Sequence, residues 1–75
     1  MFLLTEQIMN GTVTMEIIST AINTETFQQA IEKIKLLPNF DKAIITQKTD
    51  KMFTYYMKGE FPCYGKMENK QIKII

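Results

Sequence analysis

The stretch FLLTEQIMNGTVTMEIISTAI, residues 2–22, decides the fold. Asn10-Gly11 stands between two runs rich in β-branched and other apolar residues. An Asn-Gly pair favours a two-residue type I′ hairpin, because both central positions of that turn need a positive φ. Such a turn places Met9 opposite Thr12 and sets the register of the two strands outward from there. Apolar and polar residues alternate along both runs, which is typical of a sheet that is buried on one face.

In this register the two strands share one apolar face, which also receives the carboxylate of Glu6. The expected members of that face are Phe2, Leu4, Ile8, Val13, Met15, Ile17 and Ala21. The opposite face is more polar, although it carries the apolar residues Leu3, Met9, Ile18 and Ile22. We expect Glu6 to lie near the rim of the sheet and to reach water. An inward charge discourages wrong strand pairing, and one carboxylate alone is weak evidence of chemistry.

The hydrophobic period changes in residues 24–37. Five apolar residues recur with helical spacing and form one stripe: Phe27, Ala30, Ile31, Ile34 and Leu37. Thr24 is the expected N-cap, and Glu25 lies in the first turn, where the helix dipole favours an acid. Pro38 disfavours helical geometry at the residue before it and ends the helix. The stripe must cover the apolar face of the hairpin, because no other segment could cover either.

Residues 43–57 predict a second hairpin that turns near Thr49-Asp50-Lys51. Its second strand carries large side chains on both faces: Phe53, Tyr55 and Met57 alternate with Met52, Thr54 and Tyr56. Residues 59–62 and 65–70 look like loops, with Cys63-Tyr64 as a short extended piece between them. The end of the chain, KQIKII, predicts a last strand.

These elements predict one α+β domain over residues 1–75, a two-layer fold with a single helix on a mixed or antiparallel sheet of four to five strands, in the order ββαββ(β). The layout of residues 1–58 resembles that of bacterial immunoglobulin-binding domains, and the opening through Ile34 is similar to ubiquitin. This β-grasp-like resemblance implies that KQIKII runs parallel to the first strand at the centre of the sheet. It does not extend to a ubiquitin-type Gly-Gly tail, since the sequence ends in Ile74-Ile75. The alternative is an α+β meander whose last strand lies on an edge.

The small size of the chain limits how the fold is stabilised. A core of ordinary quality in a domain of 75 residues leaves about 3–5 kcal/mol of net stability. One cysteine cannot form an internal disulfide, and there is no histidine or cysteine pair to hold zinc. Self-association is the support that remains. We expect no cofactor and no metal. We also expect no membrane partner, because no stretch approaches the ~20 apolar residues that span a bilayer. A soluble, cytoplasmic protein is the expectation.

The charge pattern gives little attraction to nucleic acid. The formal net charge is +1, and all nine basic residues are lysines. Residues 1–37 carry two lysines against four glutamates, a net −2, whereas residues 38–75 carry seven lysines against four acids, a net +3. Without arginine the chain lacks the side chain best shaped for bidentate phosphate recognition.

Few residues could carry catalysis. The chain has no histidine, and its single serine, Ser19, lies in a predicted strand with no base to activate it. Cys63 is the sharpest candidate, as a thiol enzyme or redox sensor whose pKa is lowered by Lys58 or Lys66. The alternative for Cys63 is a small apolar side chain packed beside Pro62 and Tyr64, which is a common role of lone cysteines.

Residues 51–67 contain all three tyrosines and two of the five phenylalanines. A two-layer domain has one buried sheet face, so large side chains on both faces of one strand leave a surplus that is typical of protein interfaces. The predicted partner-binding residues are Lys51, Met52, Phe53, Tyr55, Tyr56, Lys58, Phe61 and Tyr64.

The leading hypothesis is therefore a small non-enzymatic protein-binding domain of the accessory, adaptor or inhibitor type. Accessory proteins of mobile elements commonly take this form. Its partner is a larger protein, a second copy in a homodimer, or both. The alternatives are a binder of single-stranded nucleic acid that uses the same aromatic residues, and a protein that acts through the thiol of Cys63.

Overall fold

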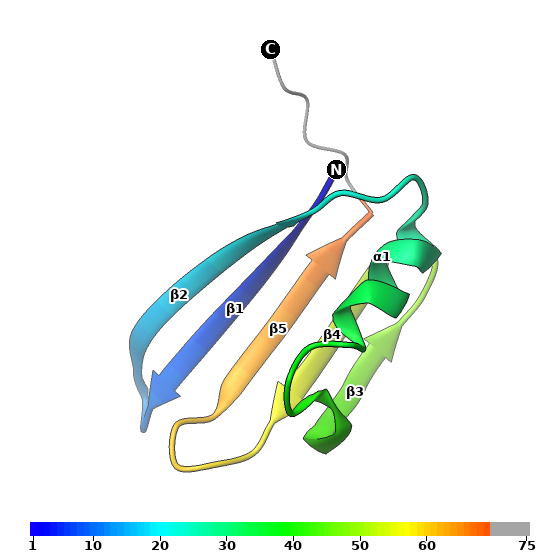
Figure 1. Ribbon diagram of the computed structural model, residues 1–75. Helices are drawn as coiled ribbons and strands as arrows, with labels where there is room; N and C mark the ends of the chain where they lie inside the picture. The colour runs from blue at the N-terminus through cyan, green and yellow to red at the C-terminus, as the bar shows by residue number, and fades with distance from the viewer. Residues whose placement is uncertain (70–75) are drawn as a thin grey trace.

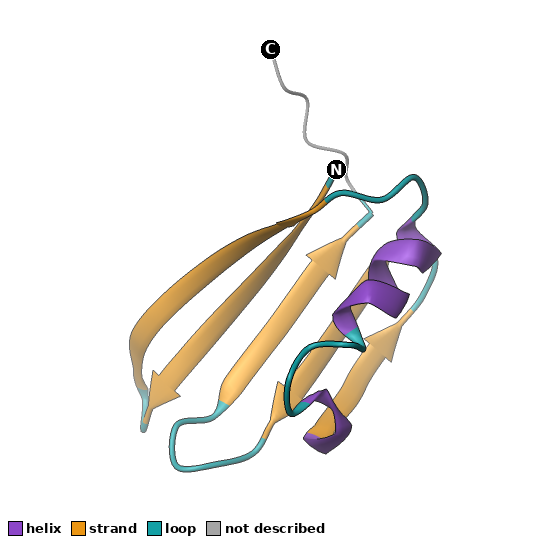
Figure 2. Ribbon diagram, viewed as in Figure 1, coloured by secondary structure: helices purple, strands orange, loops and turns teal. Residues whose placement is uncertain are grey.

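A computed structural model describes residues 1–69 of the chain. It shows a small α+β fold in two layers, in which one helix, α1 (Phe27–Ile34), lies on one face of a five-stranded antiparallel sheet (Figure 1, Figure 2). The strands in chain order are β1 (Phe2–Asn10), β2 (Val13–Ile22), β3 (Ala43–Lys48), β4 (Met52–Met57) and β5 (Cys63–Glu68). A short 3-10 helix, η1 (Phe40–Lys42), precedes β3. The predicted α+β class, with one helix on a small sheet, is confirmed.

The strands lie in the order β2-β1-β5-β4-β3, so β5 is the central strand. It pairs antiparallel with both β1 and β4. Residues 65–68, which we expected to be a loop, form most of this strand. The strand predicted for KQIKII lies outside the described residues. Among residues 1–69, β1 has only antiparallel neighbours, so the β-grasp resemblance is not confirmed.

The first hairpin is confirmed, but its turn lies one residue later than predicted. Asn10 pairs with Val13, so Gly11 and Thr12 make the turn, and Gly11 adopts the positive φ of 64°. Met9 therefore lies opposite Thr14 and not opposite Thr12. Glycine has no Cβ to clash in this left-handed conformation, and Thr12, which follows it in the turn, keeps a negative φ.

A bulge between Ile8 and Met9 shifts the register again, and Phe2 pairs with Ile22. Beyond the bulge, the net change moves the side chains of residues 16–22 to the other face, because the side-chain period of a strand is two residues. Ile18 and Ile22 thus share the face of Phe2 and Leu4, and our assignment of Ile17 and Ala21 to that face was wrong. Ile22 is buried, whereas the predicted core residues Val13, Met15 and Ile17 are 65%, 50% and 62% exposed.

The predicted helix is confirmed, but it has a different N-cap and ends at Ile34, before the expected end next to Pro38. Thr26, not Thr24, caps α1: its hydroxyl accepts from the backbone N–H of Gln29 at 3.1 Å, and the side-chain oxygen of Gln29 accepts from the N–H of Thr26 at 3.1 Å. This reciprocal capping box satisfies two backbone donors that the helix itself leaves unpaired. The helical stripe is buried as expected, with Leu37 packed against its edge.

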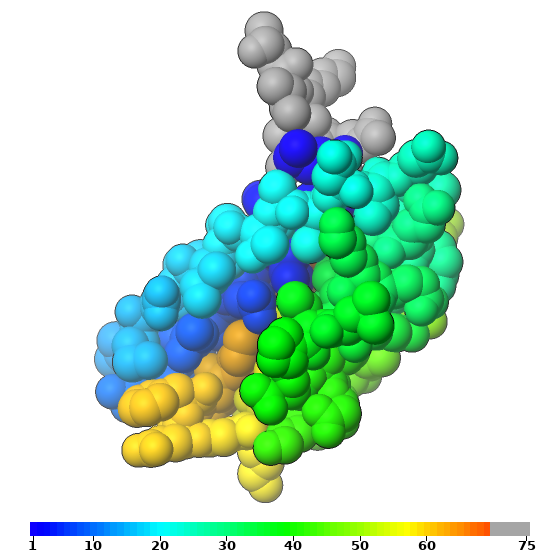
Figure 3. Space-filling model, in the orientation of Figure 1, coloured from blue at the N-terminus to red at the C-terminus, as the bar shows by residue number. Residues whose placement is uncertain are grey.

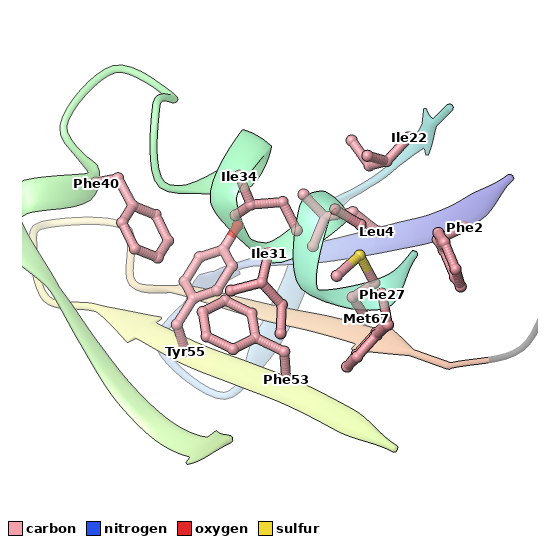
Figure 4. Packing of buried hydrophobic residues seen from close by; sticks show 11 residues of the cluster. Phe2, Leu4, Ile22, Phe27, Ile31, Ile34, Phe40, Phe53, Tyr55 and Met67 are labelled. Carbon is pink, nitrogen blue, oxygen red and sulfur yellow. The ribbon is translucent and has the colours of Figure 1, made fainter. Parts of the chain in front are cut away.

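The second hairpin is also confirmed. Its turn is held by Thr49, whose backbone N–H donates to the carbonyl of Met52 at 2.9 Å and whose hydroxyl oxygen accepts from the N–H of Lys51 at 3.1 Å. In β4 the alternation places Phe53 and Tyr55 under the helix. The Phe40 ring packs edge-on against Tyr55, with 5.1 Å between ring centroids, so η1 closes this end of the core. Figure 4 shows the cluster between α1 and the sheet.

The centre of the core depends on Gly65. This residue lies directly opposite Tyr55 on the neighbouring strand and opposite Glu6 on the other side. A Cβ atom placed on Gly65 would lie 2.1 Å from Cζ of Tyr55, so the tyrosine ring occupies the space that any other side chain would fill. Glycine in a central strand marks such a close approach of another group.

Replacement of Gly65 by alanine should therefore destabilise the fold. We expect Gly65→Ala to reduce the free energy of unfolding by about 2 kcal/mol. The ring of Tyr55 packs against Phe40 and Phe53, so it cannot move away from the added methyl group without strain. Urea unfolding followed by circular dichroism measures the change. Gly59→Ala is the matched control, since no atom lies within 4 Å of its added Cβ. Equal effects of the two substitutions would contradict the role of Gly65.

Candidate protein-binding surface

The sheet face opposite α1, here called the outer face, carries a largely apolar row of directly paired residues that crosses all five strands. The cross-sheet row consists of Ile17, Gln7, Tyr64, Tyr56 and Ile44, in that order from β2 to β3. Four of its five members are large apolar or aromatic side chains. At about 4.8 Å between strands the row is roughly 19 Å long.

The cross-sheet row is accessible to a partner. Ile17, Ile44 and Tyr64 are 62%, 58% and 49% exposed, and Tyr56 is half-buried. The rings of Tyr56 and Tyr64 stack on each other at a centroid distance of 4.9 Å and an interplanar angle of 29°. This pair fixes both rings on the surface, so a partner that binds there has less side-chain freedom to remove.

The next row of the outer face is polar and includes Ser19, Thr5, Lys66 and Thr54. Thr46 and Thr54 share a hydrogen bond of 2.6 Å between their hydroxyls, and Lys66 forms an ion pair of 3.0 Å with Glu68. Thr5, Thr46, Thr54 and Lys66 line a shallow hollow of about 520 Å³ together with Tyr64. The outer face therefore combines an apolar stripe with an adjacent line of hydrogen-bonding groups.

Most predicted partner-binding residues lie at the surface, but they do not form one patch. Tyr56 and Tyr64 belong to the cross-sheet row, and Met52 lies on the same face at the start of β4. Lys51 is exposed in the turn before β4, whereas Lys58 and Phe61 are exposed in the loop after it. The two lysines that we expected to flank the surface thus lie at opposite ends of the strand.

Two of the predicted anchors were wrong. Phe53 and Tyr55 are 0% and 1% exposed in the core, so a partner cannot reach them in the folded chain. Alternation alone could not decide which face of β4 is buried, since both faces carry large side chains. Ile17 and Ile44 were not in our predicted set. They belong to an apolar surface only because strand pairing places Ile17 beside Gln7 and Ile44 beside Tyr56.

Glu6 points to the helix side of the sheet, as predicted, and joins Tyr55 and Cys63. The Tyr55 hydroxyl donates to Oε2 of Glu6 at 2.9 Å, and Sγ of Cys63 donates to the same oxygen at 3.7 Å. Burial raises the pKa of the Cys63 thiol, and the carboxylate of Glu6 raises it further. The expectation that a lysine lowers this pKa was therefore wrong. A thiol kept protonated in this way is a poor nucleophile at neutral pH.

Among residues 1–69, no three or more acidic or cysteine side chains gather in a way that could hold a metal ion. In the same range, no helix has the length and apolar character needed to cross a membrane. Comparison with protein-family models, with curated proteins and with solved structures found no match to this chain.

The hydrogen bonds of Glu6 predict how Cys63 reacts. We expect iodoacetamide to modify Cys63 in the folded protein more slowly than in the urea-unfolded chain at pH 7.5, because burial and the nearby carboxylate disfavour the thiolate. The variant Glu6→Gln removes the negative charge and should move the labelling profile to lower pH. Mass spectrometry over a pH series measures both. Faster labelling of Cys63 in the folded protein than in the unfolded chain would contradict this prediction and support the hypothesis of a reactive thiol.

The same cluster predicts a loss of stability in alkali. Burial, followed by the hydrogen bond and charge of Glu6, raises the pKa of Tyr55 above its ordinary value of 10.0, and the pKa of Cys63 lies above 9.0. The unfolded chain loses these protons first as the pH rises. Stability should be complete below about pH 9 and then decline by up to ~1.4 kcal/mol per pH unit and group.

Tyr55→Phe tests this pH dependence. The variant lacks the hydroxyl, so its unfolding free energy should fall less steeply above pH 10 than that of the unmodified protein. Urea unfolding at pH 7, 9 and 10.5 measures both slopes. Parallel slopes for the two proteins would show that Tyr55 does not hold its proton more tightly in the folded state.

Proposed function

We propose that this chain is a small non-enzymatic protein-binding domain that docks a partner protein on the cross-sheet row. The observation that carries the proposal is the composition of that row, in which four large apolar or aromatic side chains, one from each of four strands, flank a single polar residue, Gln7. Contiguous exposed apolar residues with a polar border are typical of protein interaction sites.

The chemistry of the chain supports binding and not catalysis. The sequence contains no histidine, and the thiol of Cys63 has a raised pKa. What the fold offers instead is an uncovered sheet face with a stacked tyrosine pair, and Tyr is enriched among the residues that contribute most to binding energy. Adaptor or inhibitor action in the cytoplasm, by covering a site on a larger protein, is the form of function that we propose.

Binding of single-stranded nucleic acid is the weaker alternative. Tyr64 and Lys66 lie two residues apart on the outer face, which is how sheet surfaces stack and neutralise nucleotides. However, one side of the Tyr64 ring is covered by Tyr56, and Lys66 is paired with Glu68. The net charge of +1 adds little long-range attraction to a phosphate backbone.

The double variant Tyr64→Ser/Ile44→Ser tests the proposal. We expect it to lose the partners that the unmodified chain retains from a nuclease-treated lysate of the native cell. The reason is that it removes two large side chains of the cross-sheet row, one from β5 and one from β3. Both residues are exposed, so the cost in stability should stay within about 0.5–1.5 kcal/mol, mainly from the lost ring stacking. Quantitative mass spectrometry compares the captured proteins.

The matched control is Leu36→Ser/Val13→Ser, which removes two residues that are 83% and 65% exposed and lie outside the row. It should retain the same partners as the unmodified chain. If both double variants capture the same proteins, the cross-sheet row is not the binding surface. If partners are captured from an untreated lysate but not from the nuclease-treated one, nucleic acid mediates the capture and the proposal fails.

A further inference from the structure

The two edges of the sheet differ in how well they are protected from pairing with another strand. The β3 edge is six residues long, its ladder with β4 is irregular between Ile45 and Gln47, and it carries Lys48 at its end. Short length, a bulge and lysine are the features by which natural edge strands avoid pairing with other chains. The β3 edge has all three.

The β2 edge is longer and less protected, with one irregularity near its start and one inward-facing charge, Glu16. Every residue from Val13 to Ala21 is exposed, and within residues 1–69 no strand pairs with β2 on the side away from β1. The strand has no lysine and no proline, and its only charge is Glu16. Its one irregularity lies opposite Ile8 and Met9, which leaves residues 16–22 regular. β-Branched residues dominate this segment and favour an extended backbone.

We propose that two copies of this chain associate through antiparallel pairing of their β2 strands. Each copy offers the other the same row of unpaired N–H and C=O groups, so a two-fold axis satisfies both edges with one type of contact. In the antiparallel arrangement that axis stands perpendicular to the sheet. Residues that face each other across it must then point to the same side of the sheet, which limits the pairing register.

The charge of Glu16 selects among the registers that remain. With the axis at Ile17, the carboxylate of Glu16 faces the apolar side chain of Ile18 in the second copy. With the axis at Ile18, Glu16 faces Thr20, whose hydroxyl donates to a carboxylate, and Ile18 faces its own counterpart. On the helix side, the carboxylate and the apolar side chains next to the axis are then each opposite a suitable neighbour, whereas on the outer face Ile17 lies opposite Ser19; no like charges meet. We therefore place the axis at Ile18.

The shape of the molecule favours this contact. Figure 3 shows that β2, coloured cyan, stands away from the green α1–η1 segment, with a hollow between them where β1 and β5 are visible. Ile18 points to this helix side, since it pairs with Glu6, and it is 37% exposed. Pairing at β2 covers Ile18 of both copies. It also keeps the two outer faces on the same side of a continuous sheet, so that two cross-sheet rows face one partner.

The contact is small, because it consists of one strand pair and the side chains beside it. Interfaces that bury less than about 1,200 Å² in total belong to weak, reversible complexes. We therefore expect a monomer–dimer equilibrium that depends on protein concentration. The dimer does not rest on the proposed function, because Ile18 lies on the helix side and is not a member of the cross-sheet row.

A charge-swap experiment at Ile18 tests the proposal. Sedimentation velocity of the unmodified chain over a range of concentrations should show a dimer that forms as the concentration rises. Ile18→Lys and Ile18→Glu should each weaken association at least about tenfold, since each places like charges opposite one another at the axis. An equimolar mixture of the two variants should recover the dimer, because lysine then faces glutamate. Circular dichroism confirms that both variants fold.

The control is Val13→Lys, which puts the same charge on an exposed residue of the same strand outside the paired segment. It should associate like the unmodified chain. A chain that stays monomeric at every concentration would overturn the proposal, as would a mixture of the Ile18 variants that fails to recover the dimer. Loss of the dimer in a chain that ends at Asn69 would place the contact in residues 70–75 and would also overturn it.

Disulfide trapping checks the register independently. In the background Cys63→Ser, oxidation of Ile18→Cys should yield a covalent dimer, because facing residues of antiparallel strands have Cα atoms about 4.5–5.5 Å apart, within the range of a disulfide. Ser19→Cys should not, since its two copies are displaced by two residues, or about 6.8 Å, along the strands. Trapping through residue 19 in preference to residue 18 would refute the axis at Ile18.

Discussion

The packing of the Tyr55 ring across Gly65 is the contact on which the rest of this structure depends. Gly65 is in the central strand, and its missing side chain gives the ring of Tyr55 a path from β4 over β5 to the carboxylate of Glu6 on β1. One side chain thus links three strands beneath the helix. The buried hydroxyl finds an acceptor, so the core tolerates a polar group at its centre without an unpaired donor. Burial and, after it, the same carboxylate raise the pKa of the Cys63 thiol.

The second constraint is that one short helix must cover a five-stranded sheet. α1 is eight residues long, and with η1 it closes the core over Phe53 and Tyr55 but leaves β2 uncovered from Val13 to Ala21 (Figure 1). The outer face has no second layer among the described residues. Two kinds of surface result: an uncovered sheet face with an apolar row, and an edge strand whose outer side is unpaired among the described residues. Both follow from the ratio of helix to sheet and not from any dedicated loop.

The two proposed surfaces would bind through different interactions, and one would support the other. The cross-sheet row offers side chains, with affinity from buried apolar area and the stacked tyrosines, whereas the β2 edge offers backbone hydrogen bonds to an identical strand. Pairing two copies through β2 leaves the outer faces on one side. A partner with two matching sites would then bind both rows, and each bound row would raise the local concentration of the other. Weak self-association would thereby strengthen partner binding without a larger domain.

The sequence by itself determined the helix, the two hairpins and the inward position of Glu6, because these follow from periods of 3.6 and 2 residues over short distances. Tertiary structure alone decided the register of β2 and the central place of β5. The bulge and the position of the turn set the register of β2, and neither has a distinct sequence pattern. Residues 65–68 look like a loop in the sequence because glycine is common in loops. The reason for a glycine at this position of a central strand is the ring of Tyr55, which lies across it. The cross-sheet row could not be predicted for the same reason: Ile17, Tyr64 and Ile44 are far apart in the chain, and only the pairing of all five strands brings them into one line.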